Sequence, residues 1–73
     1  MSEEITQTER LIIKFLQKRG GFTPLISIKR NFFLNDFQAF SKVIKDMKRK
    51  GIIEVRPYGE FGWLNAFLTE KYR

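Results

Sequence analysis

Residues 35–55 read NDFQAFSKVIKDMKRKGIIEV, and the spacing of apolar side chains changes within this stretch. Before Gly51 they recur every three or four residues, which predicts an amphipathic helix over about 36–50. Asn35 is the expected N-cap, and Gln38 lies three residues further on, as in a capping box. After Gly51 the period approaches two, which predicts a strand. The chain therefore changes from helix to strand at Gly51, because a glycine after a basic turn is a common helix end.

Two more helices are expected upstream of this one. Thr6 and Glu9 have the spacing of a capping box, which predicts a first helix over about 6–19. Its apolar stripe is expected to consist of Leu11, Ile12, Phe15 and Leu16. Thr23-Pro24 predicts a second, short helix over about 24–33, with the threonine as N-cap and the proline in the first turn. The phenylalanines expected in the core are Phe15, Phe32, Phe37 and Phe40.

Downstream of Gly51 the sequence predicts a β-hairpin over about 52–69. Its strands are expected at 52–56 and 63–69, with a turn-rich tip between them. An isolated hairpin is barely stable in water, so one of its faces must lie on the helices. A chain of 73 residues supports one hydrophobic core. The predicted fold is therefore one α+β domain over 1–73, with three helices followed by a two-stranded hairpin.

The composition excludes several classes of enzyme. The chain has no Cys and no His. It therefore lacks a disulfide, a thiolate or imidazole zinc site, a Cys/His nucleophile pair and a Ser-His-Asp triad. Glu54, Glu60 and Glu70 have no spacing that brings two carboxylates together. We expect a binding protein that is not an enzyme, with no cofactor, metal or small-molecule ligand.

The positive charge is concentrated in one part of the chain. The 14 Lys and Arg residues exceed the 8 Asp and Glu residues, and residues 10–50 alone contain eleven bases and two acids. A surplus of this kind is typical of a surface that faces a polyanion, most often nucleic acid and sometimes anionic lipid. It also occurs in proteins that are merely soluble and basic.

The chain has no apolar stretch of the roughly 20 residues that cross a bilayer. Residues 1–4 contain two Glu and no base, whereas a secretory signal begins with a positive region. The absence of Cys fits a reducing compartment. We therefore expect a cytoplasmic protein that makes no membrane contact and that is associated with the nucleoid when it binds DNA.

The order helix, helix, helix, hairpin resembles the winged helix-turn-helix family of DNA-binding domains. The segments that carry the resemblance are Leu34-Asn35, Phe40-Ser41-Lys42-Val43-Ile44, Met47 and Gly51-Ile52-Ile53. They are similar to the recognition helix and wing entry of MarR-like and PadR-like regulators. Phe37 departs from these families, in which a smaller or polar residue is usual. The short basic chain also resembles small stand-alone regulators of archaea and their viruses or plasmids.

The resemblance implies a small transcriptional regulator that binds double-stranded DNA, with the helix over 36–50 in the major groove. The exposed candidates on this helix are Gln38, Ser41, Lys42, Lys45 and Arg49. Gln pairs with adenine, Lys donates to guanine, and Ser serves either base. Arg56 and Tyr58, near the tip of the wing, would reach the backbone or the minor groove. Thr23 and Ser27, at the start of the second helix, would donate to phosphates.

Other interpretations of these residues stay open. Lysines on the polar face of a helix are commonly just solvated, and the bases at 48–50 are also favoured by the helix dipole. Two other functions fit the same fold, namely a winged helix that docks a partner protein and an architectural protein that binds DNA without sequence preference. Eleven aromatic residues are difficult to bury in so small a domain. We therefore also expect a homodimer, joined through the first helix or residues 67–72.

Overall fold

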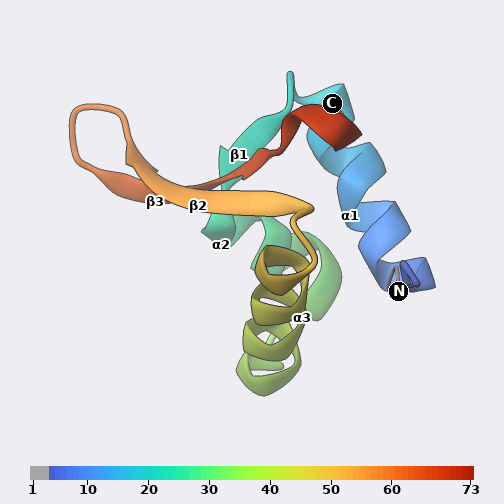
Figure 1. The fold of residues 1–73 in the computed structure, drawn as a ribbon. Helices are drawn as coiled ribbons and strands as arrows, with labels where there is room; N and C mark the ends of the chain where they lie inside the picture. The colour runs from blue at the N-terminus through green and yellow to red at the C-terminus, as the bar shows by residue number, and fades with distance from the viewer. Residues whose placement is uncertain (1–3) are drawn as a thin grey trace.

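The computed structural model describes residues 4–73, which form three helical segments beside a three-stranded antiparallel sheet, followed by a short C-terminal 3-10 helix, η2 (Glu70–Tyr72) (Figure 1). Residues 1–3, which carry part of the acidic start, lie outside the described residues. The expected α+β class is confirmed, whereas the expected two-stranded sheet is wrong by one strand. No helix within residues 4–73 is long and apolar enough to cross a membrane.

Helix α1 (Gln7–Lys18) begins at the predicted capping box. The Thr6 hydroxyl accepts the Glu9 N–H at 3.1 Å, and the Glu9 carboxylate accepts the Thr6 N–H at 2.9 Å. The buried stripe differs from the expected one, because Leu11 is exposed and Ile13 is buried. It consists of residues 9, 12, 13 and 16, a complete i, i+3, i+4, i+7 pattern. The charge of Glu9 concealed the first position of this pattern in the sequence.

A short strand that the sequence did not predict, β1 (Phe22–Pro24), precedes the second helix. It pairs antiparallel with β3 (Trp63–Leu68), with Thr23 opposite Ala66. The expected role of Thr23 as a helix N-cap is therefore wrong, because Thr23 lies in the strand. Three residues are too few to show a period of two, so this strand leaves no recognisable pattern in the sequence.

The second helical segment is a single α-helical turn, α2 (Leu25–Ile28), that continues into a π-helical turn, η1 (Lys29–Phe33). Together they cover nearly the predicted span of 24–33. At the end of η1 the Leu34 N–H donates to the Lys29 carbonyl at 2.8 Å, the i to i−5 spacing of a π-helix. Leu34 itself has a φ of 47°, a left-handed value that side chains seldom adopt.

Helix α3 (Phe37–Arg49) has a different cap from the expected one. Asp36, not Asn35, is the N-cap, and its carboxylate accepts the Ala39 N–H at 3.0 Å. Gln38 consequently lies at the second helical position rather than the third, one residue short of a capping box. Both Asn and Asp are good caps, so adjacent candidates left the helix start uncertain by one residue.

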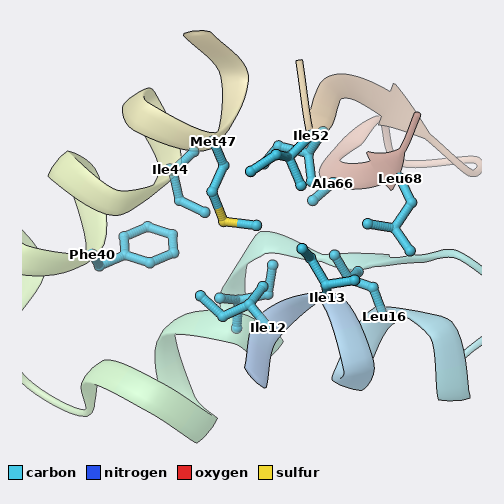
Figure 2. Packing of buried hydrophobic residues seen from close by; sticks show 11 residues of the cluster. Ile12, Ile13, Leu16, Phe40, Ile44, Met47, Ile52, Ala66 and Leu68 are labelled. Atoms are coloured by element: carbon cyan, nitrogen blue, oxygen red, sulfur yellow. The ribbon is translucent and has the colours of Figure 1, made fainter. Parts of the chain in front are cut away.

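The hydrophobic core lies between α1, α2, α3 and one face of the sheet, and Ile28 of α2 is fully buried in it (Figure 2). The buried residues of α3 are Phe40, Ile44 and Met47. The sheet and the residue before it contribute Ile52, Ile53, Ala66 and Leu68. Phe15 and Phe32 are half-buried against this cluster. The expected place of Phe37 in the core is wrong, because the buried stripe of α3 starts only one turn later and Phe37 is 62% exposed.

Strand β2 (Ile53–Tyr58) and β3 form the expected hairpin, and β3 lies between β1 and β2 in the sheet. The register pairs Ile53 with Leu68 at the base and Tyr58 with Trp63 near the tip. In Figure 1 the tip extends beyond the helices on one side, while α3 projects below the sheet. The hairpin tip and α3 are therefore two parts of the molecule that project from the rest of the fold (Figure 1).

Candidate nucleic-acid interface

The exposed face of α3 gathers four of the residues that the sequence predicted to contact DNA. Gln38, Ser41, Lys42 and Lys45 line one shallow hollow of about 350 Å³, together with Phe37 and Asp46. The four predicted positions follow the i, i+3, i+4, i+7 spacing and lie opposite the buried stripe. The helical period alone therefore brings these polar side chains onto one face.

The two lysines on this face are available to bind an anion. Lys42 and Lys45 are exposed, and within residues 4–73 neither has an ion-pair partner. Asp46, at the edge of the hollow, pairs with Arg49 at 3.5 Å. Arg49, the fifth predicted residue on α3, therefore lies beside the hollow and is partly engaged by this acid. The positive charge inside the hollow comes from the two lysines.

Lys50, at the C-terminal end of α3, has a structural role. Its ammonium group lies 2.9 and 3.1 Å from the two carboxylate oxygens of Glu9, and 2.9 Å from the Glu4 carbonyl oxygen. The pair is buried, since the side chain of Lys50 is 11% exposed and that of Glu9 is 3% exposed. From the sequence, the bases at 48–50 were expected to have a structural role, namely that of cations stabilised by the dipole at the C-terminal end of the helix. For Lys50 the cause is instead a buried ion pair between α3 and α1.

Thr23, predicted to be an exposed phosphate donor at the start of α2, is buried. Thr23 is only 2% exposed, and its hydroxyl is buried without a hydrogen-bond partner in the described chain. Pro24, which precedes α2, offers neither an N–H nor a capping side chain. Thr23 is therefore corrected from a surface donor to a buried strand residue. Ser27 is half-buried, its carbonyl accepts the Asn31 side-chain amide at 2.7 Å, and its contact with DNA stays a prediction.

The hairpin residues Arg56 and Tyr58 alternate with the core-facing residues of β2 and so lie on the opposite face of the sheet. The Arg56 guanidinium lies 4.3 Å from the centre of the Phe67 ring, and its Nε lies 3.7 Å from a Glu54 carboxylate oxygen. Tyr58 packs against Phe22 and Phe67, with ring centres 5.0 and 5.7 Å apart. Both predicted residues remain more than half exposed, and their contact with DNA stays a prediction.

The sequence predicted aromatic residues that are difficult to bury, but it did not predict that they form an apolar surface next to α3. Six large apolar side chains of the hairpin, α2 and the start of α3 are between 42% and 83% exposed. They are Ile26, Phe37, Tyr58, Phe61, Trp63 and Leu64. Trp63 and Leu64 are adjacent in β3 and therefore point to opposite faces of the strand. Two consecutive apolar residues at the exposed end of a hairpin were the signal for this surface in the sequence.

The C-terminal segment predicted to join a homodimer is used within the chain. Phe67 stacks on Phe22 with ring centres 5.3 Å apart, and Leu68 is buried. The Tyr72 carbonyl accepts the Gln17 side-chain amide at 2.9 Å, which fastens the end of the chain to α1. The homodimer itself stays a prediction.

Comparison with known proteins adds no further guide to this site. No protein-family model, no curated protein and no solved structure matches the chain. The chemistry of α3 and its surroundings is therefore what points to a function.

Proposed function

We propose that the chain is a winged helix-turn-helix protein that binds double-stranded DNA through the exposed face of α3 and acts as a small cytoplasmic transcriptional regulator. One observation carries the proposal. Gln38, Lys42 and Lys45 share one exposed hollow, and both lysines lack an ion-pair partner in the described chain. The Gln38 side chain, which can pair with a base edge, thus lies next to two lysines whose charge attracts phosphate.

The arrangement of the elements supports the winged-helix part of the proposal. Three helical segments precede the β2–β3 hairpin, and the tip of the hairpin extends beyond them, as a wing would (Figure 1). The additional strand β1 joins the sheet on the far side of β3 from β2. It leaves the order of helices and hairpin unchanged.

The dimensions of α3 suit a major groove. Its 13 residues span about 20 Å, and a groove about 12 Å wide admits one helix. In this pose Gln38, in the first turn, pairs with an adenine edge, while Lys42 and Lys45 donate to guanine or to phosphate. Ser41 lies between them and donates to either base.

We assign the main DNA contact to α3 rather than to the hairpin. The β2 strand and the tip carry Glu54 and Glu60 against one base, Arg56, so this part of the molecule is repelled by phosphate. Arg56 and Tyr58 are secondary candidates, because their side chains remain exposed beside the Phe67 ring.

The test is a fluorescence-anisotropy titration of the full chain against a mixed-sequence duplex over a series of salt concentrations. The slope of log affinity against log salt is about −0.9 for each phosphate that a protein neutralises on B-DNA. We expect a steep linear loss of affinity with salt. Lys42→Gln and Lys45→Gln should each make the slope shallower by about 1. Lys14→Gln, an exposed lysine on α1 outside the hollow, is the matched control.

Absence of binding at low salt, or an equal change in slope for Lys14→Gln, would contradict the proposal.

Selection of duplexes from a random pool then distinguishes a regulator from an architectural protein. A regulator prefers its site over other sequences by about 10³-fold or more, and Gln38→Ala should relax that preference at one base pair. An architectural protein shows no such preference.

A further inference from the structure

We propose that the apolar surface between α2 and the hairpin docks an acidic amphipathic segment of another protein. Such a segment presents large apolar side chains flanked by carboxylates. This surface, the α2–hairpin groove, is defined by Pro24, Ile26, Lys29, Arg30, Trp63 and Leu64. The inference does not depend on DNA binding by α3.

The groove consists of two adjoining hollows of about 430 and 590 Å³. Pro24, Ile26 and Trp63 line both of them, so the hollows adjoin at these three residues. The smaller hollow continues over Leu64 toward α3, and the larger one continues over Tyr58 on the other face of the hairpin. Volumes of this order accommodate several side chains of a ligand.

The exposed side chains of the groove are of the kinds that contribute most to protein interfaces. Trp63 is 64% exposed and Leu64 is 53% exposed, although a small soluble domain normally keeps contiguous apolar surface small. Trp, Tyr and Arg dominate the centres of protein–protein interfaces. Here Tyr58 and Arg30 line the same hollow as Trp63. The groove thus combines an apolar floor with the residue types of an interface centre.

The rim of the groove determines the charge of the partner. Lys29 lines one hollow and Arg30 the other, and no acidic residue lines either of them among residues 4–73. Neither base has an ion-pair partner in that part of the chain. A partner with carboxylates beside its apolar residues complements both bases, whereas a basic partner is repelled. An amphipathic helix with apolar residues at i, i+3, i+4 and i+7 is a common occupant of such a groove.

A second copy of this chain fits the groove less well than an acidic partner does. Each copy has a net charge of +6, and a two-fold contact through this face would place two pairs of Lys29 and Arg30 on one patch. No acidic residue lines either hollow to offset the repulsion between those charges. A DNA duplex also fits less well, because Trp63 and its apolar neighbours offer few donors to phosphate.

The test uses two labelled synthetic peptides of about 15 residues, some four helical turns. Both carry Leu at the same helical spacing, and one has Glu at the flanking positions where the other has Lys. Anisotropy titration with the full chain should show that the Glu peptide binds about tenfold or more tightly than the Lys peptide. Trp63→Ala and Ile26→Ala should each weaken its binding by about tenfold or more. The double variant Lys29→Glu/Arg30→Glu should reverse the preference between the peptides.

Matched variants on other faces control for general effects. Leu11→Ala truncates an exposed apolar residue on α1, and Lys14→Glu/Lys18→Glu reverses two exposed charges there. Both should leave peptide binding unchanged. Lys42→Gln/Lys45→Gln should also leave it unchanged, which separates the groove from the basic face of α3. Phe37 is unsuitable for this purpose, because it lines both surfaces.

Three results would overturn the proposal. The first is equal affinity for the two peptides, or no binding of either at about 1 mM. The second is binding of the Glu peptide that Trp63→Ala leaves intact. The third is evidence that the groove binds something else. Either the free chain forms a dimer that Trp63→Ala dissociates in sedimentation equilibrium, or Trp63→Ala abolishes DNA binding.

Discussion

Glu9 is a charged residue at the start of the buried stripe of α1, and Lys50 at the C-terminal end of α3 balances its charge. The same carboxylate accepts the Thr6 N–H, so the ion pair is coupled to the capping box of α1. Forming such a pair gains little over an apolar pair, because both charges lose water. Removing one partner is different, because the other charge stays buried without compensation.

We therefore expect Lys50→Met to lower the free energy of unfolding by about 3–5 kcal/mol. Urea denaturation followed by circular dichroism measures this change. Lys48→Met alters an exposed lysine in the same turn and should change stability by less than about 0.5 kcal/mol. The double variant Glu9→Leu/Lys50→Met should recover most of the loss, since it leaves no unpaired charge. A loss below about 1 kcal/mol for Lys50→Met would show that the pair does not hold the helices together.

Single residues were predictable where their partners are close in the sequence. Thr6 and Glu9 are three residues apart, so their capping box is visible in the sequence and is confirmed. Thr23 resembled a cap because Thr before Pro is common at helix starts. Its true neighbour is Ala66, on a strand that joins β1 only when the chain folds. No local pattern reveals such a contact.

At the level of elements, the connection between α2 and α3 contains the strained residue of the described chain. Leu34 follows the π-helical turn with φ 47° and ψ −106°, and it is the only non-glycine residue among 4–73 with a positive φ. A side chain in such a conformation costs on the order of 1–3 kcal/mol. Its side chain is 73% exposed, so little packing compensates for the strain.

Leu34→Gly should therefore raise the free energy of unfolding by about 1 kcal/mol. Glycine removes the strain but loses about 0.5–1 kcal/mol through its greater freedom in the unfolded chain. Asn35→Gly, in the same turn but without a positive φ, should instead lower stability by about 0.5–1 kcal/mol. Thermal and urea unfolding of the two variants measure both changes. Destabilisation by Leu34→Gly would mean that the turn is not strained.

The length of each element governs how well the sequence predicted it. Helix α3 and the hairpin extend over enough residues for a period to show, and both are confirmed. Strand β1 has three residues and η1 has five, so neither could reveal itself by periodicity. The i to i−5 hydrogen bond from Leu34 to Lys29 that closes the π-helical turn is likewise not visible as a sequence pattern.

At the scale of the whole molecule, the two candidate surfaces differ in how far the sequence predicted them. The polar face of α3 follows from one helical period, so its residues were predictable together. The α2–hairpin groove combines Ile26, Trp63 and Leu64, which come from distant parts of the chain. The pairing of β1 with β3 brings them together, because it sets Pro24 opposite Asn65. A surface of this kind can be recognised only once the fold is known.

The net charge of +6 is also a property of the whole molecule, and α3 concentrates part of it. Lys45 lies three residues from Lys42 and from Lys48, and four residues from Arg49. Like charges at these spacings destabilise a helix by about 0.2–0.5 kcal/mol for each pair. A lysine that serves binding rather than folding should therefore lower the free energy of unfolding of the free chain.

We expect Lys45→Gln to raise the free energy of unfolding by about 0.5 kcal/mol at low salt while the affinity for duplex DNA falls. The gain in stability should disappear near 1 M salt, where the Debye length is about 3 Å. Lys14→Gln, four residues from both Arg10 and Lys18 on α1, should give a similar gain without weakening DNA binding. Urea denaturation and anisotropy on the same samples measure the two effects. If Lys45→Gln instead destabilised the chain, the lysine would serve folding, and an unchanged DNA affinity would remove it from the proposed interface.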